Sequence, residues 1–368
     1  MIVSTPADEA RHPAGEGEYF NESWYFDFSR ADGTGGYVRL GLSPNHRVAW
    51  YWAYVVTPDH GLLAVRDHDV ALPKGDVLDV RADGLWGELV CETAMEHWGI
   101  GLEAFGVRLD SPADAYNGER GERIPVGLDI EWEAYSPVYD YPYPDGHLGA
   151  HYEHAGFVHG DILIGTDRIS FEGRGERDHS WGWRDWWIFG WHWTSFQIGE
   201  GLAVNFVRPD GGEGNHALGY VWRPGDLTPI DQVMVELIPG PDGIPNAARY
   251  VINESLEVEM EVVAPAPVPL VAPDGRTSRF PRALCRYTTD DGTGTGWGEW
   301  LQVGEPVAKC RSAERWWRST PRRARAPRRW STPKRRPSPG SGSPATVMPP
   351  TPSKGSSRRR KAGGGRSR

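Results

Sequence analysis

Short strand-like runs separated by turn residues restrict the fold of this chain more than any other feature. The runs contain alternating or aromatic residues, and each is followed by Gly, Pro, Asp or Asn. In LDIEWEAY, residues 128–135, apolar side chains alternate with acidic ones, which predicts a strand with one wet face. No comparable long helical period is present, so we predict an all-β fold of barrels or sandwiches. Further runs lie at residues 37–42, 48–56, 161–165, 169–173 and 193–198.

The length predicts two domains followed by a tail. A chain of 368 residues has room for two domains of about 150 residues, each able to bury a core. We expect one β domain over residues 15–170 and a second over residues 171–306, joined near Phe171. Strand and turn signals continue on both sides of that point without a helical block.

The C-terminal segment, residues 307–368, is strongly basic. It holds 19 of the 40 Lys and Arg residues and a single acid, Glu314. It is rich in Arg, Pro, Ser and Gly and has almost no aliphatic side chains, which predicts disorder. One interpretation is an arm that binds nucleic acid or an acidic partner. The other is an artefact, because a GC-rich gene yields this mixture when it is translated out of frame or past its stop.

The composition of the first 306 residues excludes several classes of partner. These residues include 21 basic and 49 acidic ones, and such an acidic body repels nucleic acid and anionic membranes. No apolar run approaches the roughly 18 residues of a membrane span, and the N-terminus has no secretory signal pattern. Three scattered cysteines fit a reducing compartment. We expect a cytoplasmic protein without a nucleic-acid partner unless the tail is genuine; the oligomeric state stays open.

Tryptophan is concentrated in one part of the chain. Six of the 18 tryptophans fall within residues 181–193. Aromatic side chains bury large areas, and the indole N–H remains available as a hydrogen-bond donor. A cluster of this kind either fills a barrel core or lines an apolar ligand cavity that has a few polar groups.

The segment RGERDHSWGWRDWW, residues 174–187, combines four of these tryptophans with charged residues. On a strand, the side chains of Arg177, His179 and Trp181 face one way and that of Asp178 faces the other. Gly182 then permits a bend or a bulge. The segment therefore presents a dense polar group beside an aromatic wall.

Two accounts of these charges are open. In the structural account, the guanidinium groups of Arg177 and Arg184 satisfy Asp178 and Asp185 beneath an aromatic layer. In the functional account, Asp178 or Asp185 is a proton donor with a raised pKa, and His179 is its partner. Burying charged groups is costly, and this favours a functional role for such a cluster.

Metal and nucleotide sites are not indicated. On an extended strand His151 and His154 face opposite sides, and His151 and His159 lie about 26 Å apart. Ser180 is not part of a G-x-S-x-G elbow, and the glycines of residues 292–298 precede no helix. We therefore expect no metal and no other cofactor.

Three segments together resemble bacterial proteins of the AttH-like and carotenoid 1,2-hydratase-like group. They are NESWYFDF at residues 21–28, the stretch over residues 151–187, and CRYTTDDGTGTGWGEW at residues 285–300. The resemblance spans roughly residues 15–306 and points to a branch with an Arg-Asp-His-Ser-Trp-Gly pattern. It implies two tandem lipocalin-type, calycin-like barrels in one chain. Some relatives hydrate or cyclise apolar isoprenoid or polyketide substrates, so the resemblance implies the fold more specifically than the reaction.

The resemblance also implies site residues. The Asp-His-x-Trp-Gly element of the group falls on Asp178, His179, Trp181 and Gly182. Its early Trp-Tyr-Phe falls on residues 24–26. The full set of expected ligand-binding residues is Trp24, Tyr25, Arg177, Trp181, Trp183, Arg184 and Trp186.

Two hypotheses for the function follow. In the first, an aromatic cavity binds an apolar terpenoid-, steroid- or polyketide-like molecule, and acid catalysis hydrates, cyclises or isomerises it. Asp178 and Asp185 are the expected acids, with His179 as partner. In the second, the same cavity belongs to a carrier protein that binds the ligand without turnover. Both hypotheses predict binding, and only the first predicts a product.

Overall fold

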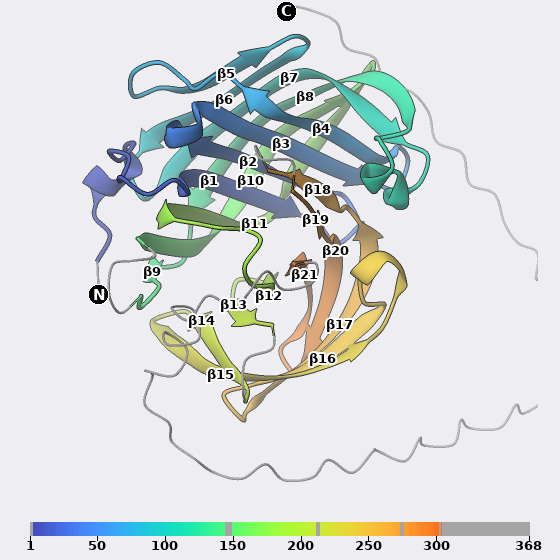
Figure 1. Ribbon diagram of the computed structural model, residues 1–368. Helices are drawn as coiled ribbons and strands as arrows, with labels where there is room; N and C mark the ends of the chain where they lie inside the picture. Colours follow the sequence, from blue (N-terminus) through green and yellow to red (C-terminus); the bar gives the residue numbers. More distant parts are fainter. Residues whose placement is uncertain (1–2, 144–148, 211–213, 273–275, 302, 304–368) are drawn as a thin grey trace, which may run out of the picture. The chain divides into compact units, whose positions relative to one another are not determined.

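The described part of the protein is built almost entirely of β-strands, which confirms the predicted fold class (Figure 1). The structure is a computed structural model that describes residues 3–143, 149–210, 214–272, 276–301 and 303. The predicted disordered tail, residues 307–368, lies outside the described residues. The helical segments that the structure describes are short 3-10 turns: η1 (Pro6–Glu9), η2 (Pro44–His46), η3 (Pro112–Tyr116) and η4 (Pro241–Gly243).

The first eleven strands form one large antiparallel sheet, drawn in blue to green in Figure 1. The strands follow the order β4-β3-β2-β1-β11-β10-β8-β7-β6-β5, and β9 pairs with β10. Their bounds are β1 (Phe20–Ser29), β2 (Gly35–Ser43), β3 (Val48–Thr57), β4 (Gly61–Val70), β5 (Leu78–Ala82), β6 (Leu85–Thr93), β7 (His97–Leu109), β8 (Gly121–Ala134), β9 (Tyr139–Asp140), β10 (Ala150–Ile164) and β11 (Asp167–Trp183).

An additional pairing curls this sheet back on itself. β4 pairs with β7 through Leu63 opposite Arg108 and Ala64 opposite Val107, so the strands from β4 through β1 and β11 to β7 form a closed ring. The alternating residues of β8 put Leu128 and Ile130 into the core of this ring, as their pattern predicts. The same core contains Trp24, which lies on β1.

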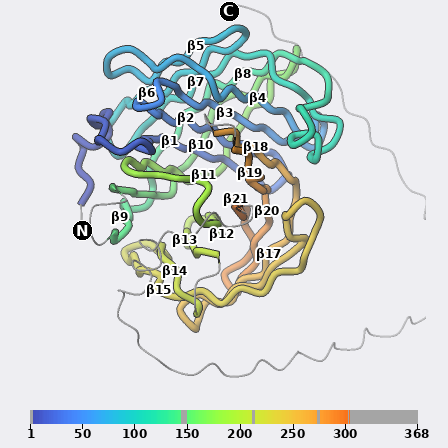
Figure 2. Tube along the Cα trace, in the orientation of Figure 1, coloured from blue at the N-terminus to red at the C-terminus, as the bar shows by residue number. Residues whose placement is uncertain are grey.

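The later strands form a closed barrel of eight strands, drawn in yellow-green to orange in Figure 2. The strand order is β12-β13-β14-β15-β16-β17-β20-β21, and β18 and β19 form a separate two-stranded sheet. The bounds are β12 (Trp191–Ile198), β13 (Leu202–Pro209), β14 (His216–Arg223), β15 (Asp226–Ile238), β16 (Ala247–Ile252), β17 (Leu256–Pro265), β18 (Val268–Val271), β19 (Thr277–Phe280), β20 (Arg282–Thr289) and β21 (Gly292–Leu301).

The chain passes from the large sheet to the barrel between Trp183 and Trp191. Phe171, where the sequence placed the joint, lies inside β11 and packs in the core of the large sheet. Strand pairing alone does not define units that fold independently, so the division at residues 170 and 171 stays a prediction. Among the described residues, no helix has the length and apolar character of a membrane span.

Candidate functional site

β11 is the strand that organises the charged residues. It pairs with β1 on one side and with β10 on the other. His179 lies opposite Trp24 on β1 and Tyr152 on β10, whereas Asp178 lies opposite Tyr25 and Glu153. Neighbouring residues of a strand point to opposite faces, so the charges of residues 176–179 separate into two clusters.

The first cluster, here called the arginine cluster, consists of Glu9, Glu22, Tyr152, Arg177 and His179. Arg177 is fully buried, and its guanidinium forms a two-point ion pair with the Glu9 carboxylate, with Nη1 2.8 Å from Oε1. Tyr152 donates its hydroxyl to Glu9 at 2.8 Å. Burial opposes ionisation of Glu9, but the charge of Arg177 and the hydrogen bonds from Arg177, Tyr152 and the Met95 backbone together outweigh it and lower the pKa of that carboxyl. A bidentate pair of this kind offsets much of the cost of burying the two charges.

Aromatic rings surround the Arg177 guanidinium. Its central carbon lies 4.7 Å from the ring centroid of Trp98, 5.4 Å from that of Tyr152 and 5.6 Å from that of Phe26. Ring faces attract cations, and this attraction is stronger where water is excluded.

The predicted partnership of Arg177 with a neighbouring aspartate is wrong. The acid that Arg177 binds is Glu9, from the N-terminal segment.

His179 lies between Tyr152 and Glu22 in the same cluster. Its Nδ1 is 3.1 Å from the Tyr152 hydroxyl, and its Nε2 is 3.2 Å from Glu22 Oε1. Trp24 stacks on the imidazole with centroids 4.5 Å apart. Burial, against the opposing hydrogen bond to Glu22, lowers the pKa of His179. The predicted pairing of His179 with Asp178 is wrong, because the two side chains lie on opposite faces of β11.

The second cluster, here called the carboxylate cluster, consists of Asp27, His151, Glu153, Glu176 and Asp178. It lies on the face of β11 that approaches the barrel. Glu176 accepts hydrogen bonds from Tyr220 at 2.7 Å and Ser195 at 3.1 Å, both on barrel strands. Burial raises the pKa of Glu176 well above its ordinary value, and the charge of Glu153 adds to the effect.

Asp27 and Glu153 complete this acidic layer. Asp27 accepts a hydrogen bond from the Glu176 backbone N–H at 2.9 Å, and burial raises its pKa to about 7. Glu153 accepts bonds from the indole of Trp193 at 3.1 Å and from Asn205. Burial also raises the pKa of Glu153. Buried carboxyls with raised pKa values are typical of functional sites, although structural networks produce them too.

Asp178 pairs with His151 rather than acting as a neutral acid. His151 Nε2 lies 3.1 Å from Asp178 Oδ2 and 2.9 Å from Glu153 Oε1. These oxygens lie off the direction of the ring N–H, so the contacts are ion pairs rather than aligned hydrogen bonds. Burial opposes ionisation of Asp178, but the charges of His151, Arg184 and Arg39 together lower its pKa. The predicted raised pKa of Asp178 is therefore wrong; Glu153, Glu176 and Asp27 have raised values.

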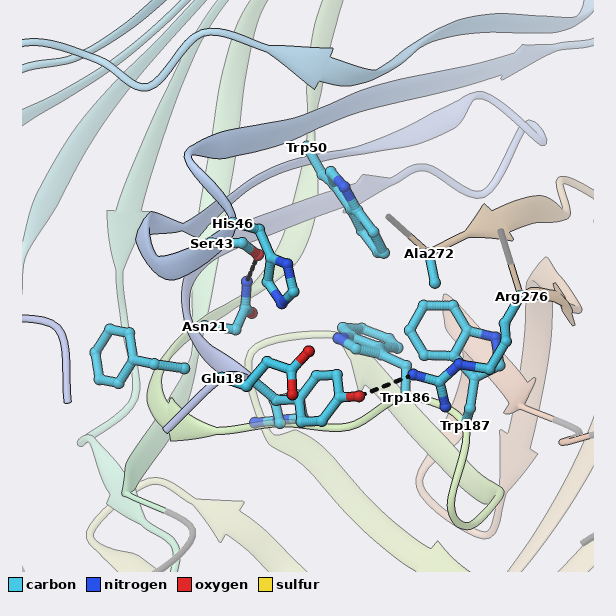
Figure 3. A pocket seen from close by; sticks show the side chains of 12 residues that line it. Glu18, Asn21, Ser43, His46, Trp50, Trp186, Trp187, Ala272 and Arg276 are labelled. Atoms are coloured by element: carbon cyan, nitrogen blue, oxygen red, sulfur yellow. Dashed lines mark hydrogen bonds between the residues drawn. The ribbon is translucent and has the colours of Figure 1, made fainter. Parts of the chain in front are cut away.

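After β11 the chain turns and lines a surface recess (Figure 3). Gly182 has a φ of 138°, which side-chain-bearing residues rarely adopt, but it pairs in regular register with Asn21, and β11 continues to Trp183. Trp186 and Trp187 then form one aromatic wall, and Trp50 of β3 lies opposite. The recess encloses about 50 Å³ and opens to solvent.

The polar side chains that line the recess are Glu18, Tyr19, Asn21, Ser43, His46, Arg184 and Arg276. Arg276 is 3.3 Å from the Tyr19 hydroxyl and stacks on Trp187 with 5.0 Å to the ring centroid. Arg184 has no carboxylate within ion-pair distance among the described residues. The side chains of Glu18 and His46 line the recess on the side of Asn21 and Ser43 (Figure 3).

Asp185 lies beside the recess and supports its wall. Its Oδ1 accepts the backbone N–H of Trp187 at 3.1 Å, and it lies 3.7 Å from Arg276 Nη1. It therefore has an arginine neighbour, as the structural account expects, although the arginine is not Arg177 or Arg184.

The residues predicted for one site are thus distributed over three places. Arg184 and Trp186 line the recess. Trp183 contacts Tyr19 of the recess edge to face, and Trp181 stacks on His12 beside the arginine cluster. The remaining predicted residues lie inside: Trp24, Arg177 and His179 in or against the arginine cluster, and Tyr25 and Asp178 on the opposite face.

Several functional candidates were absent from the prediction. Glu176 lies within the segment of residues 174–187, two residues before Asp178, and the period of a strand places the two side chains on the same face. Glu9 and Glu22 precede that segment by more than 150 residues, and no local pattern relates them to it. His46 and Trp50 precede Trp186 and Trp187, with which they line the recess, by more than 130 residues.

Comparison with solved structures shows a shared fold. A provisionally assigned AttH from Nitrosomonas europaea aligns with a TM-score of 0.58 and 16% identity, over 82% of this chain and 97% of that chain. CghA in complex with Sch210972 aligns with a TM-score of 0.50 and 12% identity, over 78% and 89%. Kievitone hydratase from Nectria haematococca gives 0.49 and 9% identity, over 77% and 89%, a likeness too low to define a shared fold.

The likeness to AttH and CghA concerns the fold alone, at this level of identity, and it agrees with the resemblance noted in the sequence. Comparison with the curated proteins gave no match. A family model described as a domain of unknown function, DUF7064, matches residues 5–304, which include both clusters and the recess. The chain belongs to the DUF7064 family.

Proposed function

We propose that the protein binds an apolar small molecule with an anionic end, of the terpenoid-, steroid- or polyketide-like class, at the aromatic recess. The observation that carries this proposal is Arg184, a cation without an ion-pair partner among the described residues, which lines the same recess as the indole rings of Trp186 and Trp187. A guanidinium recognises a carboxylate with two parallel hydrogen bonds, and the indoles supply apolar contact area.

The size of the recess determines how such a ligand would bind. An enclosed space of about 50 Å³ holds a carboxylate or a ring edge, not a whole terpenoid. The anionic end therefore enters toward Arg184, and the apolar body lies across the mouth, against Trp50 and Trp187. Arg276 orients the same end, although Tyr19 and Asp185 already occupy part of its bonding capacity.

Acid catalysis on the bound ligand is the enzymatic form of this proposal. His46 and Glu18 line the recess, and imidazole and carboxyl groups are side chains that commonly transfer protons in catalysis. In this form His46 replaces Asp178 as the group that protonates an alkene, which hydrates, cyclises or isomerises it. The shared fold with CghA, whose structure contains bound Sch210972, supports a small-molecule ligand. A carrier without turnover uses the same recess.

Two ligands that differ only in charge test the binding. Farnesoic acid and farnesol share one apolar body, and quenching of tryptophan fluorescence reports their affinity for the full chain. We expect the acid to bind at least about tenfold more tightly, since a charge-assisted pair contributes about 1.5 kcal/mol or more. Arg184→Gln should remove this difference, whereas the exposed control Arg168→Gln should keep it.

Equal affinity of the wild-type protein for both ligands, or an unchanged preference in Arg184→Gln, would contradict the proposal. Mass spectrometry of the same mixtures separates the two forms of the function. A product heavier by one water, or an isomer with a new retention time, that is lost in His46→Ala supports the enzyme. Binding without any product supports the carrier.

A further inference from the structure

Three metal-ligating side chains meet where the N-terminal segment contacts the arginine cluster. His12 Nδ1 lies 2.8 Å from Glu22 Oε1, and His179 Nε2 lies 3.2 Å from the same oxygen. The three ligand atoms all lie within 4.8 Å of one another. Ligands of a tetrahedral zinc ion with bonds of about 2.1 Å lie roughly 3.4 Å apart, so this spacing is close to a coordination site.

The hydrogen bonds around Tyr152 assign the proton on His179. The hydroxyl of Tyr152 has one proton, which it donates to the Glu9 carboxylate at 2.8 Å. The hydroxyl oxygen is therefore the acceptor of the 3.1 Å contact with His179, and Nδ1 of His179 carries the proton. Arg177 Nη2 donates to the same oxygen at 3.2 Å, which fills its second acceptor position.

This assignment leaves an unprotonated nitrogen facing a carboxylate. With the proton on Nδ1, neutral His179 presents the lone pair of Nε2 to Glu22 Oε1. Two lone pairs 3.2 Å apart in a buried site repel each other unless a cation lies between them. A second proton on His179 would create an imidazolium next to the buried guanidinium of Arg177, which is unfavourable.

His12, like His179, has one ring nitrogen facing Glu22 and the other facing a different oxygen. Its Nε2 lies 3.4 Å from Asp8 Oδ1, which directs Nδ1 toward Glu22. A metal-binding histidine commonly donates the N–H of its second ring nitrogen to a carboxylate or another oxygen, and this fixes the tautomer and the ring orientation. Asp8 is the acceptor for His12, and the hydroxyl of Tyr152, which donates to Glu9, is the acceptor for His179.

We propose that His12 Nδ1, His179 Nε2 and the Glu22 carboxylate bind one divalent metal ion of the zinc class, with water as the fourth ligand. Two imidazoles and one carboxylate are the protein ligands of known catalytic zinc sites. His12 provides the entry path, because its side chain is 19% exposed whereas Glu22 is 2% exposed. Trp181 stacks on His12 at 3.8 Å and restrains the ring.

Cobalt titration of the full chain tests this site directly. After treatment with a chelator, Co²⁺ is added and visible absorption is recorded, because tetrahedral Co²⁺ absorbs much more strongly than octahedral Co²⁺. We expect one Co²⁺ per chain, displaced by one equivalent of Zn²⁺. His12→Ala should weaken binding at least 100-fold and, lying near the surface, should leave the fold intact. Tyr152→Phe should weaken it about 10- to 100-fold, as outer-shell changes do.

Two control variants locate the ion. His159→Ala removes an exposed histidine and should change nothing. His151→Ala disrupts the other group of potential ligands, His151, Glu153 and Asp178, and should also leave Co²⁺ binding unchanged. The proposal is overturned if the protein binds no Co²⁺ or Zn²⁺ at micromolar concentrations, if His12→Ala binds as tightly as wild type, or if His151→Ala loses the ion. Arg184→Gln separates this result from ligand binding, since it should keep the metal.

Discussion

The two faces of β11 bury similar numbers of charged groups but balance them differently. On the face of the arginine cluster, Glu9 is paired with Arg177, Glu22 lies within 3.2 Å of the His12 and His179 rings, and the pKa values of both carboxyls are lowered. On the face of the carboxylate cluster, the charge of His151 lowers the pKa of Asp178, but burial outweighs the nearby cations for the other three carboxyls. The pKa values of Asp27, Glu153 and Glu176 are raised there.

This difference indicates which charged groups stabilise the fold through pairing and which lower its stability when they ionise. A paired buried charge is costly to break, because the remaining partner is left uncompensated. A buried carboxyl with a raised pKa keeps its proton to a higher pH than usual and costs stability when it ionises. The arginine cluster should therefore be sensitive to substitution, and the carboxylate cluster should be sensitive to pH.

Arg177→Met is the change with the largest expected effect on this comparison. It leaves Glu9 buried with no cation, and we expect the free energy of unfolding to fall by about 3–5 kcal/mol at pH 7. Arg168→Met, at an exposed ion pair with Asp161, should leave the free energy of unfolding nearly unchanged, because solvent screens this pair. Urea unfolding of both variants measures the difference. Similar small losses in the two variants would contradict a stabilising role of the arginine cluster.

Asp27→Asn tests the opposite face through pH. The folded pKa of about 7 lies above the ordinary 3.8, so the native state holds the proton more tightly and loses stability as pH rises between these values. From pH 5 to pH 8 the wild-type protein should lose up to about 3 kcal/mol relative to the variant. Urea unfolding at both pH values measures this. A difference between the two proteins that does not change with pH would show that Asp27 ionises normally.

The fold class was predictable because it depends on local patterns. The alternation in residues 128–135 and the turn residues between runs specify strands without knowledge of their partners. The passage between sheet and barrel was not predictable in this way. β11 continues through Phe171, which pairs with β10, to Trp183, and it pairs with β1 as well from Arg174 onward; no residue near Phe171 shows which partners it has.

The candidate site was predictable only in its central segment. Strand periodicity correctly separated Arg177 and His179 from Asp178. Their partners could not be identified, since Glu9 and His151 come from other segments and are brought together by strand register. The histidines considered for a metal were those of residues 147–159; His147 lies outside the described residues, and the proposed ligand His12 lies far from that run.

The smallest expected change in stability distinguishes Asp178 from Asp185, the two aspartates of residues 174–187. Asp178→Asn removes a charge that faces the His151 imidazole at 3.1 Å, although Glu153 still faces it at 2.9 Å, so we expect a loss of about 1.5 kcal/mol. Asp185→Asn keeps the oxygen that accepts the Trp187 N–H and loses only a 3.7 Å contact with Arg276, so its cost should be below about 0.5 kcal/mol. Melting temperatures rank the two variants, and NMR of the His151 ring should show its pKa falling in Asp178→Asn alone, because the charge of Asp178 favours the imidazolium. If Asp185→Asn lost more stability than Asp178→Asn, the prediction would be wrong. The charge of Asp185 in the wall of the recess would then stabilise the fold more than the charge of Asp178 in the carboxylate cluster.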